Sequence, residues 1–265
     1  MKNILLLVHH DPGQEARLQA ALDIVRALEG HLICIDVTPY PVIAGDAYMG
    51  FGEATVVVDE RESEARNKAT LTDRLSREDV SWNWIDVMGE MANSVLEAAD
   101  LADLVILNRA LEGYPLPNMR DITSRIVART NAAVLAVPET LARFAFDRAL
   151  VAWDGGHSAA AALRASVPLL ALAKEGEIFT AREEEIRVEP EQAAAYLSRH
   201  GIHASINAID KDGQRPDALI AEEGEAWQAD YVVMGAYGRG RLMETFGGVT
   251  RRMLECSRLP LLLGH

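Results

Sequence analysis

The residues best placed to hold a ligand lie in one glycine-rich stretch, MGAYGRGRLMETFGGVT, at residues 234–250. Gly235 and Gly238 follow an apolar run and let the backbone turn sharply and approach a ligand closely. Gly247 and Gly248 precede a segment that reads as a helix, where free N–H groups and the helix dipole favour an anion. The stretch predicts a phosphate-binding turn, although plain turns use the same residues. It is not a Walker A loop, since no Lys-Ser/Thr pair follows the glycines.

Two further side chains of this stretch suit the same site: the Thr250 hydroxyl and the Arg239 charge. His9 and His10 are adjacent on a strand, so their side chains point to opposite faces and cannot easily ligate one metal. We interpret them as a strand-end cap. No Ser-His-Asp set, carboxylate pair or Cys-x-x-Cys spacing stands out in the sequence. We therefore predict no catalytic residue and no metal site.

Composition narrows the class of protein. The chain has 265 residues, which suits one large domain or two small ones, and a formal net charge of −14, which argues against a nucleic-acid partner. No apolar run approaches the roughly 18 residues that span a bilayer. The apolar start at residues 4–8 reads as a buried strand rather than a signal peptide. Cys34 and Cys256 read as two buried thiols, so we expect a cytoplasmic protein.

The elements that must position the glycine-rich stretch repeat within the chain. Residues 103–138 align with residues 230–265 without a gap, at an offset of 127. The front ends, ILLLVHH and ALVAWDG, align at an offset of 145. The first half therefore carries 18 extra residues after its second strand. The obvious insertion is the stretch at residues 39–55, PYPVIAGDAYMGFGEAT, which we expect to be a loop that folds over something.

Each half reads β-α-β-α-β-α-β-α-β. The continuous apolar strands indicate a parallel sheet covered by helices on both faces. We expect strands near 3–9, 32–38, 80–87, 103–108 and 132–138, then near 148–153, 177–182, 203–209, 230–235 and 259–264. We expect helices near 14–28, 57–78, 91–101 and 118–129, then near 158–174, 190–200, 214–227 and 248–256. This predicts a first domain at 1–138, a linker at 139–147 and a second domain at 148–265.

The element order, the strand ending LVAWDGG and the glycine-rich turn resemble the universal stress protein family, over nearly the whole chain. The tandem length is similar to that of its two-domain members. The resemblance implies an α/β fold of two tandem, doubly wound, parallel five-stranded sheets of the adenine nucleotide alpha-hydrolase-like type. It also implies that the last strands of the two halves pair antiparallel, so that one chain forms a pseudo-dimer.

The resemblance also assigns the site. ATP-binding members carry Gly-x2-Gly-x9-Gly-Ser/Thr at this place, and Gly235 and Gly238 fit. The run at 247–250 resembles the family's Gly-Ser-Val-Thr with the serine replaced by Gly248, which removes one hydroxyl contact and leaves the backbone donors. An aspartate at Asp154 would meet the ribose or adenine, because a carboxylate at a strand end accepts bonds from hydroxyl or amino groups. The alternative for Asp154 is a turn-forming role.

Met234 would lie against the base, with ordinary core packing as its alternative. The predicted ATP contacts, with or without Mg²⁺, are Asp154, Met234, Gly235, Gly238, Arg239, Gly247, Gly248, Val249 and Thr250.

The first half has lost both glycine pairs and the aspartate. Asn108 and Leu111 stand where the second half has its first two glycines, Arg120 and Asp121 replace the second pair, and His9 replaces the aspartate. Asp121 would repel a phosphate at the helix start. We infer that the first half does not bind ATP in the family's manner.

The leading hypothesis is a tandem universal stress protein that binds ATP in its second half and responds by a conformational or partner-binding change, with at most slow hydrolysis. One alternative is a module that holds an apolar small molecule under the 39–55 insertion. Another is a structural stress protein with no ligand. A homodimer and a protein partner are both left open.

Overall fold

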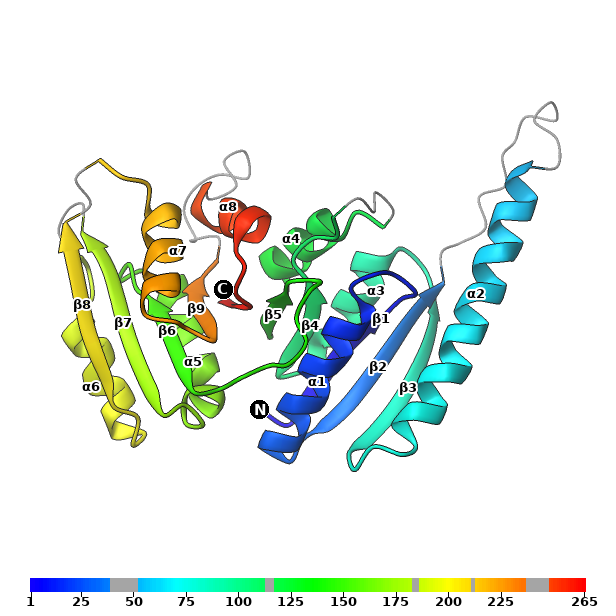
Figure 1. The fold of residues 1–265 in the computed structure, drawn as a ribbon, viewed down its shortest axis with the longest axis horizontal. Helices are drawn as coiled ribbons and strands as arrows, with labels where there is room; N and C mark the ends of the chain where they lie inside the picture. Colours follow the sequence, from blue (N-terminus) through cyan, green and yellow to red (C-terminus); the bar gives the residue numbers. More distant parts are fainter. Residues whose placement is uncertain (39–51, 113–116, 183–185, 211–212, 237–247) are drawn as a thin grey trace.

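The computed structural model describes residues 1–38, 52–112, 117–182, 186–210, 213–236 and 248–265, with the helical backbone alone at 52–62. Its described residues form a ten-stranded sheet in the order β3-β2-β1-β4-β5-β10-β9-β6-β7-β8 (Figure 1). The strands are β1 (Asn3–Val8), β2 (His31–Thr38), β3 (Ser81–Met88), β4 (Leu104–Asn108), β5 (Ala133–Val137), β6 (Arg148–Ala152), β7 (Glu175–Arg182), β8 (Ala204–Asp210), β9 (Tyr231–Gly235) and β10 (Leu261–Gly264).

The two halves share one strand order and meet at the centre of the sheet. Within each half all neighbouring strands are parallel. The single antiparallel pairing described joins β5 to β10, with Leu262 opposite Leu135. The expected pairing of the two last strands is therefore confirmed, and so is the α/β class with two parallel five-stranded units.

Helices cover both faces of this sheet. One face carries α1 (Gln14–Leu28), α2 (Gly52–Leu75), α5 (His157–Leu170) and α6 (Pro190–Arg199). The other carries α3 (Met91–Ala98) with the 3-10 turn Ala99–Leu101, α4 (Met119–Arg129), α7 (Pro216–Ala226) and α8 (Gly248–Cys256). Alternate residues of one strand enter different clusters: Leu6 faces α1, and Leu5 and Leu7 face α3 and α4. Period-two burial on both sides explains why the strands are apolar without interruption.

Local signals set several helix boundaries. α6 begins at Pro190 behind a capping box made by Glu189 and Gln192. α3 begins where the Glu90 carboxylate accepts the N–H groups of Ala92 and Asn93.

Residues 138–147, between β5 and β6, hold no helix or strand. The domain division placed there stays a prediction.

The sequence predicts a loop at residues 52–55, but α2 already begins at Gly52, so these four residues form its first turn. Residues 39–51 of the insertion lie outside the described residues. Cys34 is buried, and burial raises its pKa to about 12, whereas Cys256 was expected to be buried and is exposed near the end of α8. Among the described residues, no helix is long and apolar enough to cross a membrane.

Candidate functional site

The register of the sheet brings the second half's candidates to one edge. Ala152 of β6 lies opposite Met234 of β9. Asp154 follows β6 by two residues and Gly235 ends β9, so both lie at the carboxyl edge of adjacent parallel strands. This edge is where open α/β sheets hold their ligands.

Asp154 forms a turn and remains open to solvent. Its Oδ1 accepts the N–H of Gly156 at 2.8 Å, and Gly155 between them has a φ of 69°. The turn-forming role considered for this aspartate is therefore present. The residue is exposed. A carboxylate held by one oxygen in a turn can still accept a ligand's hydrogen bond with the other.

Gly235 and Met234 both have structural duties. A Cβ at Gly235 would lie 2.4 Å from the backbone nitrogen of Ala159, so glycine is needed here for the approach of α5 to β9. Met234 is 4% exposed and packs with Ala152 and Met253 in the core between the sheet and α7–α8. The core-packing alternative for Met234 is thus observed, and a ligand can contact only its margin.

The start of α8 brings Gly248, Val249 and Thr250 together. Thr250 is buried and Val249 packs partly against the core. A Cβ at Gly248 would lie 2.6 Å from Nη1 of Arg252, whose Nε donates to Asp217 Oδ1 at 2.8 Å. Gly238, Arg239 and Gly247 lie outside the described residues.

Sequence reasoning missed Arg252, which places a positive charge beside the first residue of α8. The repeat contained the signal. Arg125 stands at the matching position of the first half, and its guanidinium binds both oxygens of Glu90 at 2.8 and 3.0 Å. Arg125 of α4 therefore binds a carboxylate at the start of α3, and Arg252 of α8 binds one at the start of α7.

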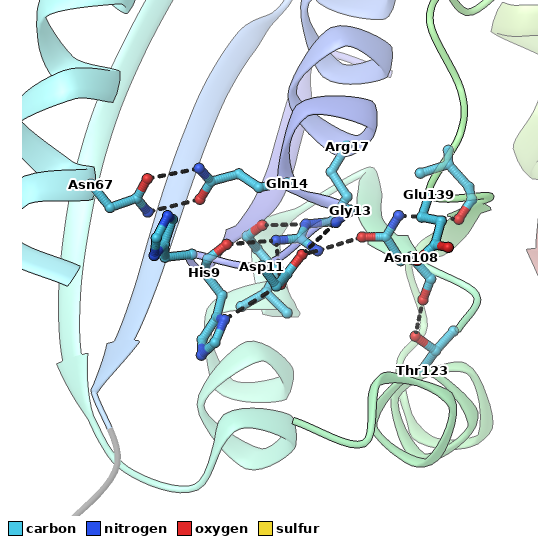
Figure 2. A network of polar contacts seen from close by, with 12 residues as sticks. His9, Asp11, Gly13, Gln14, Arg17, Asn67, Asn108, Thr123 and Glu139 are labelled. Carbon is cyan, nitrogen blue, oxygen red and sulfur yellow. Dashed lines mark hydrogen bonds and ion pairs between the residues drawn. The ribbon is translucent and has the colours of Figure 1, made fainter. Parts of the chain in front are cut away.

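The carboxyl edge of the first half is filled by its own side chains (Figure 2). Arg17 of α1 is fully buried, and its guanidinium lies between Asp11 and the Oδ1 of Asn108. It donates to Asp11 Oδ1 and Oδ2 at 2.9 Å each, and also to the carbonyls of Leu7 and His9 at 3.1 Å each. A buried cation with five donors is fully satisfied here.

This network sets the charge state of Asp11. Burial pushes the pKa of Asp11 upward, but the close contact with His9 and the charge and hydrogen bonds of Arg17 outweigh burial and hold it below its usual range. Asn108, in the position of Gly235, accepts from Arg17 and donates to the Val137 carbonyl at 3.3 Å. The Arg17 guanidinium therefore takes up the hydrogen-bonding capacity of Asp11 and Asn108, which would otherwise be available to a ligand.

His9 lies at the strand end, as interpreted from the sequence. Its Nδ1 is 3.4 Å from Asp11 and its Nε2 is 3.8 Å from Glu64 of α2. No group of three or more His, Cys, Asp or Glu residues in the described ranges is arranged to hold a metal ion. Asp121, expected to repel a phosphate, has its N–H capped by Asn118 at 3.3 Å in the first turn of α4.

Comparison with known proteins places the second half in a family. The sequence pattern of the Universal stress protein family matches residues 145–264. A search of curated proteins found no match.

One solved structure shares the fold over the whole chain. A universal stress protein from Archaeoglobus fulgidus DSM 4304 is similar over 100% of this chain and 98% of its own, with a TM-score of 0.77 and 14% identity. UspA from Lactobacillus plantarum covers 50% of this chain and 94% of its own, with a TM-score of 0.40 and 15% identity. A family member from Arabidopsis thaliana, solved with AMP bound, covers 44% and 90%, with a TM-score of 0.33 and 12% identity. Identities this low speak only for the fold. By the family match, residues 145–264 form a domain of the universal stress protein family.

Proposed function

We propose that residues 148–265 bind ATP, with Mg²⁺, at the carboxyl edge of β6 and β9 and at the start of α8. The observation that carries the proposal is the family match over residues 145–264, which includes every candidate contact. The register supports it, since Asp154 and Gly235 lie on adjacent strands at that edge.

Each described residue has a role in this proposal. Asp154 accepts hydrogen bonds from the ribose or the adenine, and the margin of Met234 lies against the base. The backbone N–H groups of Gly248 and Val249 and the Thr250 hydroxyl meet the phosphates, in line with the preference of helix N-termini for anions. Gly238, Arg239 and Gly247 lie outside the described residues and stay predicted contacts.

The output we propose is a conformational or partner-binding change rather than fast catalysis. Efficient hydrolysis needs a base that orients and activates water. Asp154 is the one carboxylate among the proposed contacts, and one of its oxygens already holds a turn. At most slow hydrolysis fits this arrangement.

The proposal is asymmetric between the two halves. In the first half, Arg17 satisfies Asp11 and Asn108 internally, and both are buried with it. Expelling this guanidinium would leave a buried carboxylate uncompensated, which costs several kcal/mol. We therefore propose one ATP per chain, in the second half.

The test is an affinity comparison with a conservative variant. Asp154→Asn keeps an oxygen that can accept from Gly156 N–H, so the turn survives, but it removes the negative charge. Loss of a charge-assisted bond of about 1.5–3 kcal/mol should weaken ATP binding by about 10- to 100-fold. The matched control is Asp210→Asn, another exposed aspartate at a strand's carboxyl end in the same half, on β8, two strands away from β6.

Calorimetric titration with ATP and Mg²⁺ measures both variants. The proposed site predicts that Asp210→Asn binds like the wild type. Equal affinity in a folded Asp154→Asn protein would remove Asp154 from the site, and absence of binding by the wild type would refute the proposed function.

A further inference from the structure

One side chain of the first half reaches into the second. Arg109 follows β4, and its Nη1 donates to the carbonyl oxygens of Leu254 at 3.2 Å and Glu255 at 2.7 Å. Both carbonyls lie in the last turn of α8, where the final four carbonyls have no partner inside the helix. Arg109 thus caps the carboxyl end of the helix whose other end begins the proposed ATP site.

The repeat shows that this contact is particular to the first half. Arg109 stands where the second half has Ala236. The backbones at the two positions behave alike: Arg109 N donates to Val137 O at 3.0 Å, and Ala236 N donates to Gly264 O at 2.8 Å. Only the side chain differs, because Ala236 is a buried methyl group and Arg109 carries a guanidinium across to α8.

The charge at this place suits the helix. A cation at a helix carboxyl end interacts favourably with the helix dipole. Burial lowers the pKa of Arg109, while the nearby carboxylates of Glu112 and Glu139 favour its charged form. Arginine stays charged in proteins, so this half-buried guanidinium carries a desolvation cost. The two carbonyl contacts of Nη1 offset part of that cost, while the buried Nε has no hydrogen-bond partner among the described residues.

Arg109 is itself held from the first half. Its neighbour Asn108 is fully buried, accepts from Arg17 and donates to Val137 O, and the Asn108 carbonyl accepts the Thr123 hydroxyl at 2.7 Å. Asn108 belongs to the hydrogen-bond network around Arg17 (Figure 2), and the next residue along the backbone, Arg109, donates to the carbonyls of α8.

The geometry of α8 links its two ends. Nine residues make a rod of about 13 Å, short enough that a shift of one end moves the other. We propose that Arg109 is a positioning residue for the ATP site: by capping the last turn of α8 it keeps Gly248 and Thr250 in place at the first turn. This inference rests on the proposed function. In this proposal the first half, which lacks the glycine pairs and the aspartate, serves to position α8 of the second half.

The test combines ligand affinity with hydrogen exchange in the full chain. Arg109→Ala should weaken ATP binding by about fivefold and speed amide exchange within α8 of the ligand-free protein. Arg109→Lys, whose ammonium can still donate to carbonyls, should recover part of both effects. The control is Arg120→Ala, since Arg120 also reaches α8 from the first half but through an exposed ion pair with the Glu255 side chain at 3.4 Å.

The outcomes separate the two proposals. Weaker binding and faster α8 exchange in Arg109→Ala, both partly restored by lysine and both absent in Arg120→Ala, support the positioning role. Wild-type affinity in Arg109→Ala overturns it, whatever the exchange shows. If the wild type binds no ATP, the proposed function fails; unchanged α8 exchange in Arg109→Ala would then overturn the capping role separately.

Discussion

Replacing Arg17 by methionine tests the closed first half most severely. Methionine has a similar length and suits a buried site, but it donates no hydrogen bond. Arg17 and Asp11 have fully buried side chains, so the change leaves an uncompensated buried carboxylate. Breaking a buried pair in this way costs about 3–5 kcal/mol. At roughly 2–4 °C per kcal/mol for a domain of this size, we expect a fall in Tm of about 6–20 °C.

The assay is thermal unfolding with two companion variants. Adding Asp11→Asn to Arg17→Met removes the stranded charge and should recover about half of the loss, because an amide oxygen still accepts from Gly13 N–H. Arg74→Met removes a guanidinium that pairs with Glu15 and Glu78 near the surface, and should cost at most about 1 kcal/mol.

The pH dependence has a definite sign. In the wild type the pKa of Asp11 lies below its unfolded value, so the carboxylate adds stability above the unfolded pKa and loses it as pH falls through the folded pKa. Without Arg17, burial raises that pKa, so the deficit of Arg17→Met should be widest near neutral pH and shrink toward about pH 4. A Tm within about 3 °C of Arg74→Met, or no recovery on adding Asp11→Asn, would refute this account of the first half.

Two further predictions concern packing and titration in the second half. Burial and the facing carboxylate of Glu223 raise the pKa of Glu177 to about 7, so the folded pair holds a proton that the unfolded chain releases near 4.5. Stability should therefore fall by about 2 kcal/mol as pH rises from about 5 to about 8, and Glu177→Gln should flatten this fall in thermal unfolding; an unchanged slope would contradict it. A Cβ at Gly264 would lie 2.4 Å from the Cα of Ala162, so Gly264→Ala should cost about 1–3 kcal/mol in urea unfolding. Gly176→Ala, with its nearest contact at 3.4 Å, is the control, and equal losses would show that α5 does not press on β10.

Much of the fold was predictable because it depends on periodicity and on the repeat. Continuous apolar runs such as residues 104–107 and 133–137 favour strands buried on both faces, and both halves repeat them. The loss of the glycine pairs predicts a first half unable to bind ATP in the family's manner, and the stoichiometry of ATP binding tests this. The start of α2 was missed, since Pro, Gly and Tyr in the insertion favoured a loop as far as residue 55.

The side chains that close or brace the site could not be predicted, because their partners are remote in sequence. Arg17 lies in an amphipathic segment where an arginine is usually solvated, and its partner Asn108 is 91 residues away. Arg109 meets carbonyls 145 and 146 residues away. Gly235 was assigned to ligand approach, but a sequence does not reveal which atoms come close to a glycine; here the start of α5 does.

The stoichiometry of ATP binding tests the central claim most directly. Calorimetric titration of the wild-type chain with ATP and Mg²⁺, with AMP titrated in parallel, measures it in one experiment. The account predicts saturable binding of about one ATP per chain, because Asp154 of the second half is exposed at the carboxyl edge, whereas Arg17 occupies the polar groups at that edge of the first half. Two ATP per chain would contradict the closed first half, and no binding would contradict the site in the second.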